Sequence, residues 1–119
     1  MFEALLKDVV DATEGAVAAV VMDLHGITLA SVERGDGPPD VKSVGIELTV
    51  VLKSVKQAAG MLEVGEAQEL VIVAEQLTTV VRIVSDEYFV ALALAPGGNL
   101  GRARYLLRVR VPELVSELS

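Results

Sequence analysis

The sequence predicts an α+β sandwich, in which helices cover the faces of an antiparallel sheet. Segments with helical and strand-like hydrophobic patterns follow one another in the order α-β-β-α-β-β-β-α. The last three strand-like segments are joined by short connections, which favours antiparallel pairing. With 119 residues, 52 % of them hydrophobic, the chain should form one domain over residues 1–119.

The first half of the chain should begin with a helix and two strands. Apolar residues at helical spacing predict a helix that ends near Gly15, namely Phe2, Leu5, Leu6, Val9 and Ala12. The continuous apolar run 16–22 is too short for a helix and predicts a buried strand. A turn over 23–26 leads to a returning strand over 27–32. Glycine, proline and aspartate crowd residues 33–40, which predicts an exposed loop.

A long central helix is predicted from residue 41 to residue 62. Its main apolar stripe recurs in steps of three and four: Val41, Val44, Leu48, Val51, Val55, Ala58 and Leu62. Asp40 is a natural N-cap, and Gly65 should close the helix. Valine and threonine are weak helix formers, so packing must hold this helix in place.

Three strands and a last helix complete the predicted fold. Strand-like runs cover 70–75, 79–84 and 88–95, and residues 96–99 form a loop. The last helix carries one apolar stripe: Leu100, Ala103, Leu107, Val111, Leu114 and Leu118. Pro112 lies inside it, so the helix should bend there or consist of two short helices.

Composition and motifs exclude several kinds of site. The chain has no cysteine, which excludes disulfides, a thiol nucleophile and cysteine-ligated metal. Its one histidine, His25, excludes a multi-histidine metal site and should be an exposed turn residue. Neither a P-loop nor a dinucleotide fingerprint occurs, so we expect no nucleotide chemistry. No nucleophile and base are visibly paired, so we predict no catalytic residue, no cofactor, no metal and no enzyme activity.

Charge and hydropathy indicate which classes of partner and which cellular location we expect. Ten Lys and Arg stand against 17 Asp and Glu, a net charge of −7, which disfavours nucleic acid as a partner. The apolar runs are far shorter than the roughly 20 residues of a membrane helix, so we expect no membrane insertion. The N-terminus lacks a signal-peptide core, which favours a cytoplasmic location.

The central helix also carries a second apolar stripe. On a helical wheel Ile46, Val50 and Met61 lie nearly opposite the main stripe. A helix on one sheet needs only one apolar face, so a second stripe predicts a second contact, unless these are scattered surface hydrophobics. The apolar run 69–75 contains no proline, and at a sheet edge it would pair with another chain. We therefore predict a homodimer with these interface residues: Ile46, Val50, Leu70 and Ile72.

Basic residues gather on two helices. Lys42, Lys53 and Lys56 share one flank of the central helix, where Glu47 is the only acid. Apolar anchors beside charges suit a protein partner, because the anchors give affinity and the charges steer the approach. The predicted partner surface is Lys42, Lys53, Lys56 and Met61. The competing interpretation is that the lysines only solubilise the helix. The last helix carries Arg102, Arg104, Arg108 and Arg110, which can simply offset nearby acids.

Three local patterns occur together with this order of elements. The first is Ala16-Val17-Ala18-Ala19-Val20-Val21, then a turn ending in Gly26 and a strand through Ala30-Ser31. The second is Val80-Val81-Arg82-Ile83 followed by Tyr88-Phe89-Val90-Ala91-Leu92. The third is Asn99-Leu100-Gly101 at the start of the last helix. Over essentially the whole chain, this resembles the roadblock family, the dynein light-chain type also found as bacterial regulators of Ras-like GTPases.

The resemblance implies a central five-stranded antiparallel sheet with helices on both faces. It implies a homodimer formed through the central helix and the strand after it. It also implies a Ras-like small GTPase as partner, typically one that controls motility or polarity in bacteria. The protein would recruit this GTPase or stimulate its hydrolysis by positioning the GTPase's own residues. The alternative functions are a structural scaffold or adaptor in a larger assembly, and a small-ligand sensor domain.

Overall fold

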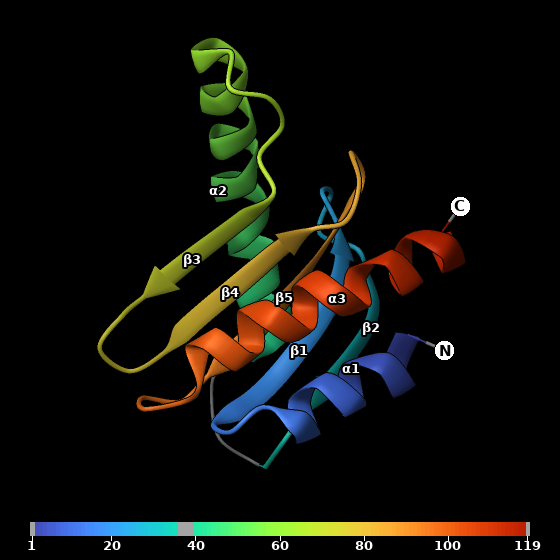
Figure 1. The fold of residues 1–119 in the computed structure, drawn as a ribbon, viewed down its shortest axis with the longest axis vertical. Helices are drawn as coiled ribbons and strands as arrows, with labels where there is room; N and C mark the ends of the chain where they lie inside the picture. The colour runs from blue at the N-terminus through green and yellow to red at the C-terminus, as the bar shows by residue number, and fades with distance from the viewer. Residues whose placement is uncertain (1, 36–39, 119) are drawn as a thin grey trace.

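A five-stranded antiparallel sheet forms the centre of the computed structural model, which describes residues 2–35 and 40–118 (Figure 1). The strands are β1 (Ala16–Asp23), β2 (Thr28–Glu33), β3 (Glu69–Val73), β4 (Thr78–Ile83) and β5 (Tyr88–Leu94). They lie in the order β2-β1-β5-β4-β3, and each neighbouring pair is antiparallel. The predicted α+β class is confirmed, and β3, the strand after the central helix, lies at a sheet edge.

Helices cover both faces of this sheet. Two of them, α1 (Phe2–Ala12) and α3 (Leu100–Leu118), lie on one face, and α2 (Val41–Leu62) lies on the other (Figure 1). Each face has its own core. Leu6 and Leu107 pack with Val80 under α1 and α3, whereas Leu48 packs with Phe89 under α2.

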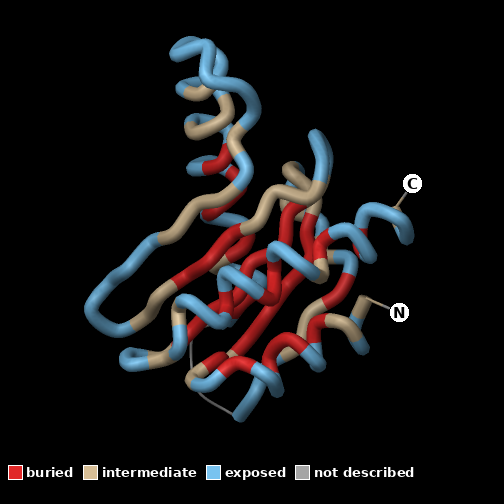
Figure 2. The backbone as a smooth tube through the Cα atoms, in the orientation of Figure 1, coloured by how far each residue is buried: buried red, intermediate tan, exposed pale blue. Residues whose placement is uncertain are grey.

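The central strands are buried from both sides, which explains their continuous apolar sequences. In β5, Leu92 packs into the core beneath α1 and α3, and its neighbours Ala91 and Ala93 pack into the core beneath α2. The edge strands are more exposed than β1 and β5, as the colours of Figure 2 show. Burial therefore falls from the middle of the sheet toward both edges.

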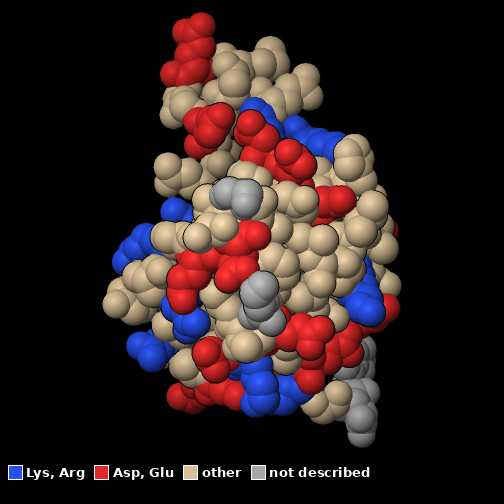
Figure 3. Space-filling model, turned by 90° about the vertical axis from the view of Figure 1, so that its right-hand side faces the viewer, with Lys and Arg blue, Asp and Glu red and all other residues tan. Residues whose placement is uncertain are grey.

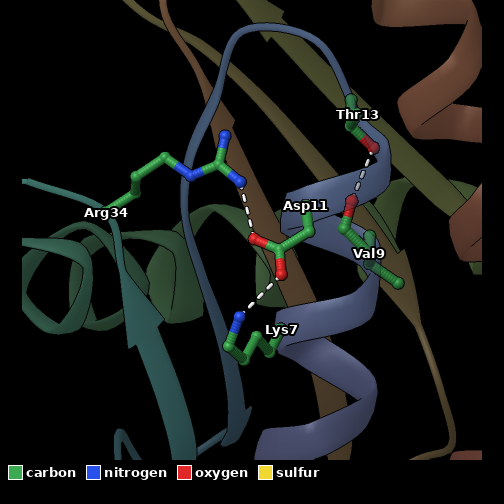
Figure 4. A network of polar contacts seen from close by, with 5 residues as sticks. All are labelled: Lys7, Val9, Asp11, Thr13 and Arg34. Atoms are coloured by element: carbon green, nitrogen blue, oxygen red, sulfur yellow. Dashed lines mark hydrogen bonds and ion pairs between the residues drawn. The ribbon is translucent and has the colours of Figure 1, made fainter.

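Polar contacts fix the end of α1 against the segment after β2 (Figure 4). The Asp11 carboxylate accepts hydrogen bonds from Lys7 Nζ at 2.7 Å and from Arg34 Nη2 at 2.6 Å. These two cations hold the pKa of Asp11 below its usual value, with Lys7 the larger cause. Thr13 Oγ1 donates to the Val9 carbonyl at 2.7 Å and satisfies a buried hydroxyl beyond the last turn. Asp11 therefore joins α1 to a residue 23 positions further along the chain.

Helix boundaries follow the predicted signals with one difference, at the end of α2. Asp40 caps α2 as predicted, because its side chain accepts a hydrogen bond from the Lys42 N–H at 3.1 Å. The helix ends at Glu63, which adopts a left-handed backbone with φ of 56°, and not at Gly65. Pro112 lies inside α3, which runs as one helix across it, so of the two predicted alternatives the pair of short helices is wrong. Of the predicted loop 33–40, residues 36–39 lie outside the described part of the chain.

Candidate protein-interaction surface

Only the first half of α2 packs on the sheet. Its buried residues all lie between Val41 and Leu52: Val41, Gly45, Leu48, Thr49 and Leu52. Gly45 lets the helix approach β1 closely, because an added Cβ would lie 2.7 Å from the Met22 Cε atom. Beyond Leu52 the helix projects past the sheet (Figures 1 and 2). The turns of α2 after Leu52 therefore expose apolar side chains to solvent, because they extend beyond the sheet.

The main apolar stripe of α2 is not centred on the core. Val41 and Leu48 are buried, but Val51 is 39 % exposed and Leu62 is 71 % exposed. The other buried residues of α2 are Gly45, Thr49 and Leu52. On a helix with 3.6 residues per turn, these three lie to one side of the main apolar stripe. The stripe is thus turned partly into solvent. Sequence analysis missed Val51 and Leu62 as exposed residues, because periodicity does not show where the helix leaves the sheet.

The two flanks of α2 face different parts of the sheet. Ile46 lies beside the β1–β2 turn, where a Cβ added to Gly26 would be 3.6 Å from Ile46 Cγ1. Lys56 shares this flank, and its Nζ donates to the Asp86 carbonyl in the β4–β5 turn at 3.2 Å. The opposite flank carries Val51 and Leu62 and faces away from both turns.

The edge strand β3 presents apolar side chains on both faces. Leu70 packs against the core under α2, and Ile72, two residues on, lies on the same face and is 38 % exposed. Val71 packs against the other core, and Val73 follows it on that face. The only strand that pairs with β3 within the described residues is β4. One row of backbone N–H and C=O groups is therefore open to another strand.

The four predicted interface residues fall into two groups. Leu70 and Ile72 lie together on the β3 edge, on the face that also carries α2. Ile46 lies at the β1–β2 turn, and β2 is the opposite edge of the sheet from β3. Val50, 65 % exposed, lies on the outer face of α2. The structure does not bring Ile46 alongside Leu70 and Ile72.

The predicted partner residues lie along the exposed side of α2. Lys42 and Lys53 are exposed, and neither side chain forms an ion pair within residues 2–35 and 40–118. Lys56 is partly buried by its contact with the β4–β5 turn. Met61 is 77 % exposed at the outer end of the helix. On the side of the molecule seen in Figure 3, acidic and basic side chains are interspersed.

A hollow lies between the outer half of α2 and the end of the sheet. It has a volume of about 700 Å³ and is lined by α2 residues, the segment 63–68 and the β4–β5 connection. Its charged lining residues are Lys56, Glu63, Glu66, Arg82 and Asp86. Its size falls within the range of ligand sites.

No candidate metal-binding cluster is found in the described part of the chain. It contains no group of three or more His, Asp or Glu side chains that could hold a metal ion. His25 is exposed, and its backbone N–H donates to Asp23 Oδ1 at 2.9 Å, as in an ordinary turn. None of the described helices is long and apolar enough to cross a membrane.

Comparisons with known proteins find similar structures. Neither a scan of protein-family models nor a search of curated proteins gives a match. Among solved structures, MglC from Myxococcus xanthus is 35 % identical to the chain, with 98 % of each chain covered and a TM-score of 0.70. An MglB structure with a tetrameric arrangement is 20 % identical, with 95 % of this chain and 84 % of that chain covered and a TM-score of 0.85. A Roadblock/LC7 domain from Streptomyces avermitilis is 13 % identical, with 98 % and 96 % covered and a TM-score of 0.85.

The last two comparisons establish the fold, and the identity to MglC extends over nearly the whole chain. The chain belongs to the roadblock family.

Proposed function

We propose that this roadblock protein is a noncatalytic homodimer that binds a Ras-like small GTPase. The observation that carries the proposal is the apolar flank of α2, which extends beyond the sheet and leaves Val51 and Leu62 in solvent. Such a surface is stabilised by burial against a partner, at roughly 25 cal/mol for each Å² of apolar area.

A second copy suits this flank because two features meet on one face of the sheet. The exposed side of α2 lies on the same face as Leu70 and Ile72 of the open β3 edge. Antiparallel pairing of two β3 strands would continue the sheet across a two-fold axis, and each α2 would then cover apolar residues of the other protomer. Self-association of a relative supports the proposal, since the similar MglB structure has a tetrameric arrangement.

The GTPase would bind the solvent side of α2. Lys42 and Lys53 are unpaired within the described residues, and they flank the exposed side chains of Ile46 and Val50. In the dimer, two such helices present a doubled basic ridge with apolar anchors, which attracts an acidic protein surface. Family membership supports a GTPase as that partner. As a noncatalytic regulator, the protein would act by recruiting the GTPase or by positioning the GTPase's own residues.

The experiment combines the purified protein with the Ras-like GTPases of its source organism, loaded with GDP or with a non-hydrolysable GTP analogue. Calorimetry should show saturable binding of one of them, and single-turnover assays should show whether GTP hydrolysis accelerates. Binding without acceleration would establish recruitment. Absence of binding to every such GTPase would contradict the proposal and leave the scaffold function.

The hollow beneath α2 favours a small-ligand sensor as the second candidate function. Its volume of about 700 Å³ would accommodate a metabolite-sized molecule. Native mass spectrometry of protein purified from its own organism tests this candidate directly. A bound small molecule that is lost in a Gly60→Trp variant, which should fill the hollow, would support it; a spectrum with the protein mass alone would contradict it.

A further inference from the structure

The face of β3 turned toward α3 is left uncovered. Glu69, Val71 and Val73 alternate onto this face, and Val71 packs against the core beneath α1 and α3. Helix α3 packs over β4 and β5 and does not extend over β3 (Figure 1). Val73 is consequently 71 % exposed at the sheet edge. This surface lies on the opposite side of the sheet from α2 and from the proposed GTPase site.

Three arginines surround one carboxylate beside these valines. Arg104 on α3 donates to both Glu69 oxygens at 2.9 Å, and Arg82 on β4 is the cross-strand neighbour of Glu69. Arg108 follows one turn after Arg104, with its guanidinium 5.6 Å from the centre of the Tyr105 ring. The three cations lower the pKa of Glu69, Arg104 most strongly, which places all of them within electrostatic reach of it. One carboxylate cannot pair with three guanidinium groups at once, so Arg82 and Arg108 can still bind a further carboxylate.

Neither Arg82 nor Arg108 forms an ion pair within residues 2–35 and 40–118. Tyr105 is 48 % exposed. Tyrosine and arginine are the side chains that most often carry the affinity of protein interfaces.

We propose that Val71, Val73, Arg82, Tyr105 and Arg108 form a second docking surface, here called the arginine–valine surface, for an acidic segment of a partner protein. Aspartate or glutamate side chains of that segment would pair with Arg82 and Arg108, and an apolar side chain between them would cover Val73. Nucleic acid fits less well, because the net charge of −7 repels a phosphate backbone. The valine side chains also have no charge or hydrogen-bonding group with which to bind it. The surface does not depend on the proposed GTPase site, since the two lie on opposite faces.

A peptide selection tests this assignment with defined probes. Random peptides are selected on the immobilised wild-type protein, and the enriched sequence is synthesised with a fluorescent label. We expect acidic residues around an apolar residue, binding that weakens as salt is raised, and shifts of amide signals in β3 and α3. Arg108→Glu combined with Arg82→Gln should weaken binding by at least about tenfold. Val73→Ala should weaken it as well, and it leaves the arginines and the charge of the β3 edge unchanged, so it separates lost apolar contact from lost charge.

Arg102→Glu is the matched control, because Arg102 is exposed on the other flank of α3. This variant should bind the peptide like the wild type, and all variants should keep their melting temperature, their oligomeric mass and their GTPase binding. The proposal is overturned if the enriched peptides lack acidic residues, if they bind the Arg82 and Arg108 variant equally well, or if their signals map to α2. Competition by a single-stranded oligonucleotide would instead assign the surface to nucleic acid.

Discussion

Glu69 on β3 and Arg104 on α3 form a two-point contact, in which Arg104 Nε and Nη2 each donate to one carboxylate oxygen at 2.9 Å. The contact joins the edge strand β3 to α3, the last helix of the chain. Its planar, bidentate geometry fixes direction as well as distance. The pair also raises the pKa of Arg104 and lowers that of Glu69, through the hydrogen bonds first and the attraction of the charges second.

This pair predicts a loss of stability in acid. The pKa of Glu69 in the folded state lies below its ordinary value of 4.5, so the unfolded state binds the proton more tightly. The stabilisation is present in full above pH 4.5 and is lost as the pH falls through the lower folded pKa. Urea unfolding between neutral and acid pH should show this decline. Glu69→Gln should flatten that part of the curve, and an unchanged slope would contradict the assignment.

A close backbone contact predicts that Gly15 cannot be replaced. Its φ is +85°, and an added Cβ would lie 2.4 Å from Gly98 Cα, where the chain enters α3. Gly15→Ala should lower the free energy of unfolding by more than about 2 kcal/mol. Gly97→Ala is the matched control, because its φ is +82° but an added Cβ meets no atom within 4 Å. That variant should cost only the backbone strain, about 1 kcal/mol. Equal losses in the two variants would show that the contact with Gly98 is unimportant.

A charge on the β3 edge should separate the proposed dimer. Ile72→Lys places an ammonium group in the paired region, at a cost on the order of several kcal/mol once buried. Size-exclusion chromatography with light scattering should then show monomer at concentrations where the wild type is dimeric. Ile27→Lys is the control, because Ile27 is 60 % exposed at the β1–β2 turn, away from the β3 edge. Dissociation of both variants alike would argue against the β3 edge as the interface.

Charge reversal on α2 should weaken the binding of the GTPase without changing the fold. Lys53→Glu with Lys56→Glu reverses the basic flank, so we expect a large loss of GTPase affinity and a slower association. Melting temperature and dimer mass should hardly change, although Lys56 loses its bond to the Asp86 carbonyl. Unchanged binding by the Lys53 and Lys56 variant would move the GTPase site to the arginines of α3.

Helix α2 and strand β3 illustrate which structural features could be predicted from the sequence and which could not. Asp40 and the apolar period were sufficient to predict the helix and its start, and the run 69–75 predicted a strand, because these signals are local. The place of this strand at the sheet edge follows from the strand order. Which residues of the main apolar stripe are buried depends on where α2 extends beyond the sheet. The exposure of Val51 and Leu62 could therefore not be predicted from the sequence. The position of Ile46 depends on the packing of the β1–β2 turn against α2, which is a tertiary contact. The Glu69–Arg104 pair joins residues 35 positions apart and follows only from the sheet order.

The central claim is that two copies associate through the exposed flank of α2 and the open edge of β3. Sedimentation velocity of the wild-type protein at tens of micromolar tests it most directly. The account predicts one species of about twice the chain mass of 12.6 kDa. A single species at the chain mass, with nothing larger across the concentration range, would contradict it.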